Sequence, residues 1–315
     1  MRHKYKFILL TTAAVLFIAL FLFTDLRHVE YVLPRRLMKV SAIILTGAAI
    51  AIATLVFQTI TNNRILTPSM IGLDSLYMLL QTALIFLFGS ANLTFWNNYV
   101  NFGLSIVLMI GFALILYKLL FKGDGRPIYF LLLVGIILGT FFSSLSSFMQ
   151  VLIDPNEFLL IQDKMFASFN NVQTELLVIS VILLVLAFLY LWRFMKYLDV
   201  LSLGRDHAVN LGVPYDAVIK QLLGIIAVFI AVATALVGPI TFLGLLVVNI
   251  AYHFIPTYRH RDLMAASVLI SIIALVAGQW MVEHVFTFST TISVIINFVG
   301  GLYFIRLLLK ENRLR

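Results

Sequence analysis

Hydrophobic runs separated by short polar segments occupy almost the whole chain. Most runs are continuous and about 20 residues long, the length that an α-helix needs to cross the hydrocarbon core of a bilayer. Strands of a membrane barrel would alternate hydrophobic and polar positions over about ten residues. Because lipid offers the backbone no hydrogen-bond partners, helices are favoured. The pattern predicts an all-α integral membrane protein with ten spans, at about 5–24, 37–60, 69–90, 101–121, 127–150, 174–194, 216–237, 240–255, 262–282 and 290–309.

The eighth and first hydrophobic runs differ from the others in length or position. The run at 240–255 is short and follows the seventh after only Gly238-Pro239, so nine spans plus a re-entrant segment is an alternative. The first run is too long for a signal peptide, and no small-residue cleavage site follows it, so we expect it to be retained. The polar stretches at about 25–36, 151–173 and 195–215 do not resemble domain linkers. Residues 1–315 are therefore expected to form a single transmembrane domain.

Composition agrees with a membrane protein. Hydrophobic residues make up 62% of the chain and charged residues 11%, whereas an average soluble domain is about 25% charged. A soluble enzyme and a disordered chain are therefore excluded. The chain has no cysteine, which excludes disulfides, thiolate zinc sites and a cysteine nucleophile.

The distribution of basic residues predicts the orientation. If the N-terminus is cytoplasmic, 17 of the 22 lysines and arginines lie on the inner side, as the positive-inside rule requires. The outer ones are Arg27, Arg35, Arg36, Lys39 and Lys164. Ten spans then place both termini in the cytoplasm, whereas nine would put the basic C-terminus outside. The net charge of +8 is thus an orientation signal, and we expect no nucleic-acid partner.

Catalytic chemistry has little support in the sequence. Ionisable groups inside spans are costly and usually functional, but Asp74 is the only clear case, and Glu283-His284 lies at an outer edge. The lack of a proton relay argues against a secondary transporter. The chain has no H-E-x-x-H, G-x-S-x-G or phosphate-loop motif, and its six histidines do not cluster. We therefore expect no catalytic residues, no metal site and no cofactor, and any ATP to be hydrolysed by another chain.

The fifth run carries two patterns that bear on packing and transport. Gly135 and Gly139 form a G-x-x-x-G pair, which lets helices approach closely. A polar face follows at positions i, i+3, i+4 and i+7, made of Ser143, Ser146, Ser147 and Gln150. This face predicts either hydrogen bonds between helices or the lining of a water-filled translocation path.

The inner stretch at about 195–215 is the most informative polar segment. Asp206, Ala208 and Leu211 predict a short amphipathic helix that Gly212 and Pro214 end. Such a helix, with small and apolar residues facing outward, suits docking into a groove of another protein. A plain connecting loop is the alternative.

Several motifs together give this chain a family resemblance. The inner stretch resembles the L-G-x-x-x-A-x-x-L-G signature of the iron-chelate and cobalamin (FecCD-like) family of ABC importer permeases, and it is matched by Leu203, Gly204, Ala208, Leu211 and Gly212. The stretch from Gly238 to Leu245 is similar to the family's G-x-I-x-F-x-G-L. Further matches are Leu33-Pro34-Arg35, Gln58, Asn63, Leu66, Pro68 and Gly72. The resemblance runs from about residue 33 to the C-terminus, although Val248-Asn249 replaces a common Pro-His pair.

The resemblance implies a fold, partners and roles for residues. Family members have ten transmembrane helices and dimerise as identical or related subunits in the bacterial cytoplasmic membrane. A cytoplasmic ABC ATPase would bind the coupling helices at Gly204, Ala208, Leu211 and Gly212, so this chain would not be an enzyme. An extracytoplasmic binding protein, often a lipoprotein, would dock on Arg35, with Arg36 adding charge. The cargo would be an iron-siderophore complex, of the catechol type because of residues 72–77. Haem or cobalamin is the alternative cargo, and a secondary carrier or a membrane enzyme or receptor is the alternative class.

Overall fold

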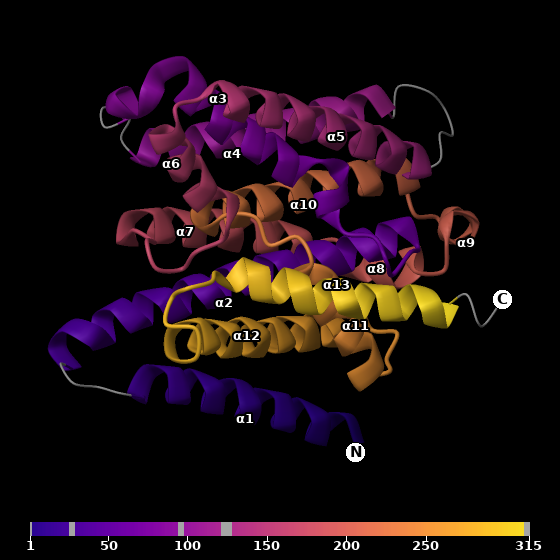
Figure 1. Ribbon diagram of the computed structural model, residues 1–315. Coiled ribbons are helices and arrows are strands. Elements are labelled where there is room, and N and C mark those ends of the chain that lie inside the picture. The colour runs from indigo at the N-terminus through magenta and orange to yellow at the C-terminus, as the bar shows by residue number, and fades with distance from the viewer. Residues whose placement is uncertain (1, 25–28, 94–97, 121–127, 312–315) are drawn as a thin grey trace.

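The computed structural model describes residues 2–24, 29–93, 98–120 and 128–311, and these residues form helices and connecting segments only (Figure 1). The elements are α1 (Arg2–Phe23), α2 (Val29–Thr61), η1 (Pro68–Ile71), α3 (Leu73–Leu93), α4 (Asn98–Leu120), α5 (Ile128–Leu152), α6 (Pro155–Met165), α7 (Thr174–Trp192), α8 (Met195–Leu201), α9 (Arg205–Asn210), α10 (Tyr215–Val237), α11 (Leu243–Phe254), α12 (His260–His284) and α13 (Ile292–Glu311).

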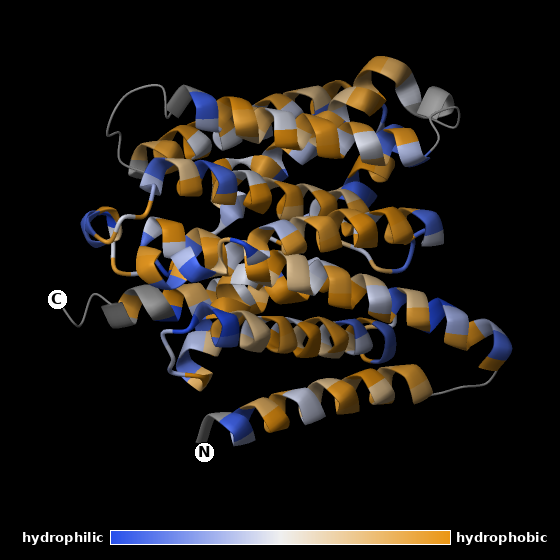
Figure 2. Cartoon of the chain, turned by 180° about the vertical axis from the view of Figure 1, so that it is seen from behind, coloured by the Kyte–Doolittle hydropathy of each residue, from blue (hydrophilic) through white to orange (hydrophobic). Residues whose placement is uncertain are grey.

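Ten of these helices correspond to the predicted hydrophobic runs. Seven are long and apolar enough to cross a membrane, and α3, α11 and α13 contain shorter apolar helices. The long helices lie roughly side by side in one bundle, and the N-terminal end of α1 and the C-terminal end of α13 lie at the same end of it (Figure 1). Hydrophobic residues cover the middle of the helices and hydrophilic residues collect at their ends (Figure 2). The all-α membrane architecture is confirmed.

Helix α2 lies at the centre of the bundle and is longer than predicted. It packs against α10 and α12, and every residue from Ile50 to Thr61 is buried. Small side chains around Gly47 permit this close packing, since a Cβ added at Gly47 would meet the Ser271 hydroxyl at 2.5 Å. The helix starts at Val29 rather than near residue 37, and Pro34, in its second turn, removes one helical hydrogen bond.

Helix α11 covers only part of the predicted eighth span. Its 12 residues rise about 18 Å, whereas the hydrocarbon core is about 30 Å thick. The residues from Gly238 to Phe242 precede it as irregular backbone. Gly238 has a φ of +102°, and a Cβ there would lie 3.1 Å from the Ala167 Cα. The eighth run is therefore a short helix entered through a close contact between backbones.

Two further features of the fold were not predicted from the sequence. Helix α6 forms within 151–173, where we expected only a polar connection. Asp154 caps it, because its carboxylate accepts a hydrogen bond from the Asn156 amide at 2.8 Å. In α3, Gly89 has a φ of +69° and ends the regular part of the helix.

The predicted Gly135-Gly139 pair is a site of close packing. A Cβ at Gly135 would lie 2.7 Å from the Ile71 Cα, and one at Gly139 would lie 3.1 Å from the Gly72 Cα. Gly72 itself has a φ of +87°, which side chains with a Cβ rarely adopt. The backbones of α5 and η1 thus touch at this crossing, which anchors α5 next to α3.

Candidate functional site

The coupling segment, defined here as residues 195–214, forms two short helices at the end of the bundle where both chain ends lie (Figure 1). Gly204 and Gly212 flank α9 with φ values of +97° and +79°. A Cβ at either position would meet nothing within 4 Å, so the backbone conformation, and not crowding, favours glycine. The predicted short helix is therefore present, between two left-handed glycines.

Ala208 lies on the opposite side of α9 from the one we expected. Its side chain is fully buried, whereas Leu211 is 64% exposed. The Val213 amide donates a hydrogen bond to the Ala208 carbonyl at 3.0 Å, which folds the end of α9 back onto α10. The outward-facing apolar residues are Leu203, Val209 and Leu211, and we call these three the coupling surface. Ala208 thus supports this surface from beneath.

A partly buried polar contact joins the coupling segment to two membrane helices. The Asp199 carboxylate of α8 accepts hydrogen bonds from the His260 amide at 2.8 Å and from its ring Nδ1 at 2.6 Å. The other ring nitrogen, Nε2, lies 2.8 Å from the Thr59 hydroxyl on α2. These residues are far apart in sequence, so no local motif could reveal the contact. The contact therefore links α8 to α12 and α2.

We expect Asp199→Ala to destabilise the permease, because the N-terminus of α12 loses its side-chain acceptor. Such losses cost about 0.5–2 kcal/mol, and the lower half applies here since the Asp199 side chain is 43% exposed. Thermal unfolding in detergent measures the effect. Asp206→Ala, which removes an exposed carboxylate from α9, is the matched control. Equal melting temperatures for the two variants would contradict the capping role.

The polar face of α5 has two parts. Ser146 is buried, with its hydroxyl 2.9 Å from that of Thr82 on α3, and Gln150 donates to the same Thr82 hydroxyl at 3.3 Å. Ser143 is exposed but donates to the Ser75 hydroxyl at 3.1 Å. Ser143, Ser146 and Gln150 therefore form hydrogen bonds with residues of α3, as expected if this face makes hydrogen bonds between helices.

The exposed polar stripe of α5 includes residues that we did not predict. Thr140 and Ser144 are exposed alongside Ser147, at positions i, i+4 and i+7, so they share one face of the helix. Exposed hydrophobic residues such as Ile137, Phe141 and Phe148 lie on the same outward side. The i, i+4, i+7 spacing of these hydroxyl residues could have revealed the stripe in the sequence, but the predicted polar face was centred about one residue position away from it. This stripe is available to another subunit or to a water-filled path.

Asp74 joins α3 to the segment before α11. Its carboxylate accepts a hydrogen bond from the Thr241 hydroxyl at 3.3 Å, which connects the start of α3 to the irregular segment before α11. Within the described residues, no three His, Asp or Glu side chains are placed to hold a metal ion.

The two predicted docking arginines at the other end of the bundle have different surroundings. Arg35 is exposed, and its guanidinium lies 4.1 Å from the centre of the Tyr31 ring. Arg36 is half-buried and donates to the backbone carbonyls of Leu22, at 3.2 Å, and of Thr24. Arg36 therefore holds the C-terminal end of α1 against α2, and Arg35 is the one that faces outward.

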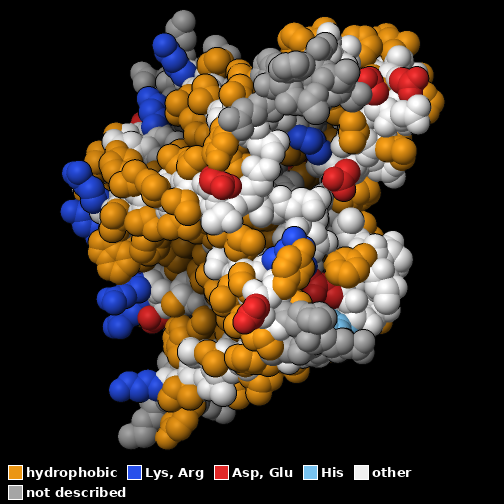
Figure 3. Space-filling view, turned by 90° about the vertical axis from the view of Figure 1, so that its left-hand side faces the viewer, with side chains coloured by type: hydrophobic (Ala, Val, Ile, Leu, Met, Phe, Trp, Pro, Cys, Tyr) orange, Lys and Arg blue, Asp and Glu red, His pale blue; other side chains and the backbone are white. Residues whose placement is uncertain are grey.

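A polar cavity of about 750 Å³ opens beside Arg35. Lys39 and Glu283 form an ion pair across it at 2.7 Å, and Gln279 donates to the same carboxylate at 2.9 Å. Figure 3 looks onto this end of the bundle and shows acidic side chains spread over it. Exposed acids at this end are Glu30, Asp154, Asp163 and Glu175. The surface around the exposed arginine is thus mixed in charge.

Lys164 forms a second polar cluster that sequence reasoning missed. Its ammonium donates to the Gln81 side chain at 3.0 Å, and Gln81 donates in turn to Asn101 and Ser105, both at 3.0 Å. Burial lowers the pKa of Lys164, and the neighbouring Asp163 carboxylate partly offsets this. The cluster ties α6 to α3 and α4, which fixes α6 over this end of the bundle.

Known proteins resemble this chain over nearly its whole length. The FecCD transport family matches residues 7–310. The petrobactin import system permease protein YclO of Bacillus subtilis (strain 168) is 64% identical, with 99% of each chain covered. Two permeases of Bacillus anthracis, FatC and FatD, both from a petrobactin import system, are 35% and 29% identical. The match covers 90% of this chain and 80% of FatC, and 89% of this chain and 81% of FatD.

A solved structure shares the fold. An inward-facing metal-chelate type ABC transporter superposes with a TM-score of 0.85 at 22% identity, covering 98% of this chain and 99% of that one. The shared fold therefore extends over almost the whole chain.

Proposed function

Because the chain belongs to the FecCD transport family, we propose that it is the permease subunit of an ATP-driven ABC importer for a ferric siderophore of the petrobactin type. The observation that carries this proposal is the 64% identity, over 99% of both chains, with a petrobactin import permease. The siderophore would supply the ligands of the iron, so the permease needs a path for the complex rather than a metal site of its own. The importer would act in the bacterial cytoplasmic membrane.

The second subunit of the permease would be a related chain rather than a second copy. Bacillus anthracis has two distinct petrobactin import permeases, and this chain is more similar to FatC than to FatD. A FatD-like chain would cover the exposed face of α5, where the stripe of Thr140, Ser144 and Ser147 lies among hydrophobic residues. The translocation path would then lie between the two subunits. Of the polar residues predicted to line it, Ser147 and Ser143 are exposed, whereas Ser146 and Gln150 support them through contacts with α3.

The cytoplasmic ATPase would bind the coupling surface of Leu203, Val209 and Leu211. These apolar side chains are exposed in a polar segment, which suits insertion into a groove. The excess of basic residues at this end supports its placement in the cytoplasm, together with both termini. Gly204, Ala208 and Gly212 would hold the surface in shape, and Asp199 and His260 would pass its movement to α12.

The binding protein would dock at the opposite end, on Arg35. We expect Arg35→Glu to weaken the association about fivefold at low salt, with a smaller effect at high salt, because exposed ion pairs contribute up to about 1 kcal/mol and are screened. Titration of the reconstituted complex with the binding protein at two salt concentrations measures this. Glu175→Gln, at an exposed acid of the same end, is the control. Equal affinity of Arg35→Glu and the unmodified chain at both salt concentrations would remove Arg35 from the interface.

Reconstitution tests the function itself. Proteoliposomes that contain this chain, a FatD-like permease, the ATPase and the binding protein should accumulate labelled ferric petrobactin only when ATP is present inside. Unlabelled haem or cobalamin should not compete, and ionophores should not stop uptake. Competition by haem or cobalamin would reassign the substrate, and uptake that stops with ionophores but not without ATP would indicate a secondary carrier.

A further inference from the structure

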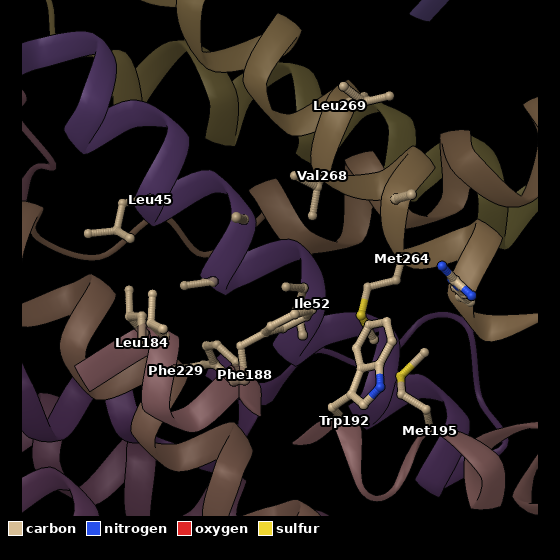
Figure 4. A pocket seen from close by; sticks show the side chains of 15 residues that line it. Leu45, Ile52, Leu184, Phe188, Trp192, Met195, Phe229, Met264, Val268 and Leu269 are labelled. Atoms are coloured by element: carbon tan, nitrogen blue, oxygen red, sulfur yellow. The ribbon is translucent and has the colours of Figure 1, made fainter. Parts of the chain in front are cut away.

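An apolar groove lies between helices at some distance from the proposed path. Helices α2, α7, α10 and α12 and the start of α8 form its walls, and its volume is about 580 Å³. Leu45, Ile52, Leu184, Phe188 and Phe229 point into it from three of these helices (Figure 4). Cavities of this size hold small organic ligands, and this one offers almost only hydrocarbon to its occupant.

The groove opens toward the side of the bundle that faces lipid. Leu184 and Phe229 are buried at its floor, whereas Val185 and Trp192 on α7 are both 48% exposed at its edge. Helix α7 continues this apolar exposure beyond the groove, at residues such as Ile182, Leu186 and Leu189. Because hydrophobic side chains are exposed all along α7, this side of the bundle faces the bilayer. The groove therefore opens to lipid.

One end of the groove carries positive charge. The Arg261 guanidinium lines it and lies 5.6 Å from the centre of the Trp192 ring. Arg193 and Lys196 directly follow the lining residues Trp192 and Met195 in the chain, and both are exposed, as is Arg259. The two acids nearby are Asp199, whose carboxylate is bonded to His260, and Asp262, which is half-buried. Basic groups therefore outnumber free carboxylates at this mouth.

We propose that this groove binds one acyl chain of an anionic phospholipid, with the headgroup at Arg261. A hydrocarbon chain matches the apolar walls, and a negatively charged headgroup matches the basic mouth. The orientation given under Proposed function places this mouth at the cytoplasmic leaflet, whose anionic lipids attract basic residues near the surface. Arg261 and Trp192 also form the pairing of a cation with an aromatic ring that suits the interface between hydrocarbon and headgroups.

The position of the groove gives the lipid a route to affect transport. Met195, at the start of α8, lines the groove, and α8 carries the Asp199 contact to α12 and α2. A bound chain would fill the space between α7, α12 and the start of the coupling segment. We therefore expect bound anionic lipid to stabilise the position of the coupling segment relative to the membrane helices.

Trp192 provides a direct readout of occupancy. A single-tryptophan variant, made with Trp96→Phe and Trp280→Phe, leaves Trp192 as the reporter. In liposomes, phosphatidylglycerol with brominated acyl chains should quench its fluorescence with about fivefold higher apparent affinity than brominated phosphatidylcholine, the ratio that one basic residue near an anionic surface provides. Arg261→Gln should bring this ratio close to one. Arg306→Gln, at an exposed arginine of α13, is the matched control and should leave the ratio unchanged.

Three outcomes would overturn the proposal. Equal quenching by the two lipids in the unmodified reporter would remove the headgroup site. No quenching by either lipid would show that no acyl chain enters the groove. Loss of quenching when the full importer is assembled would assign the groove to a protein partner instead. The measurement uses no siderophore and no ATP, so its failure is separate from a failure of the proposed transport function.

Discussion

Leu211→Arg is expected to abolish ATP hydrolysis that the binding protein stimulates, while the permease stays folded in the membrane. The Leu211 side chain is 64% exposed, so a longer polar side chain fits there without disturbing the chain's own packing. In the complex, the same position would lie inside the groove of the ATPase. An unpaired charge buried there costs several kcal/mol, so we expect at least a tenfold loss of stimulated activity in proteoliposomes.

A variant of the neighbouring Ala208 distinguishes a defect in ATPase binding from a defect in folding. Its side chain is fully buried, so Ala208→Arg should lower the melting temperature of the isolated permease, which Leu211→Arg should not. Leu211→Met keeps an apolar side chain of similar volume and should retain most of the activity. Normal stimulation of the Leu211→Arg variant would exclude α9 from the ATPase interface.

Gly135→Leu is expected to have the largest effect on stability. A Cβ at this position would lie 2.7 Å from the Ile71 Cα and 3.1 Å from the Ile71 carbonyl oxygen. Both neighbours are backbone atoms, so the clash is relieved only if α5 moves away from η1. Overpacking of this kind costs about 1–3 kcal/mol, occasionally more. Thermal unfolding in detergent should show a melting temperature several degrees below that of the unmodified chain.

Gly111 of α4 offers the matched control. A Cβ added there meets nothing within 4 Å, and Gly111→Leu makes the same chemical change in another membrane helix. This control should unfold at or above the temperature of the unmodified chain, because leucine is the better helix former. If both variants unfold at the same temperature, the crossing of α5 and η1 is not under the constraint that its geometry indicates.

The sequence predicted the bundle well because hydrophobic runs of about 20 residues are a strong signal. It predicted the ends of helices less well. The polar stretch at about 25–36 suggested that the second span begins after it, but α2 extends back through this stretch to Val29. Helix α6 was missed because its 11 residues are too few to cross a membrane and mix polar with hydrophobic side chains, so they give no membrane signal.

The site was harder to predict than the fold. A helix as short as α9 completes fewer than two turns, so the pattern could not tell whether Ala208 or Leu211 faces outward. Arg36 and Arg35 are neighbours in sequence, and only the position of the end of α1 separates their roles. The Asp199–His260 contact joins residues 61 positions apart, and such contacts have no local spacing to recognise.

The unbroken length of α2 has a mechanical consequence. Arg35 lies near one end of this single helix and Thr59 near the other, with about 36 Å of regular backbone between them. A rigid rod that pivots near its middle moves its two ends in opposite directions. Binding of a protein at the Arg35 end would then displace the Thr59–His260 contact at the other end through the movement of α2 alone. No chain of intermediate side chains would be required.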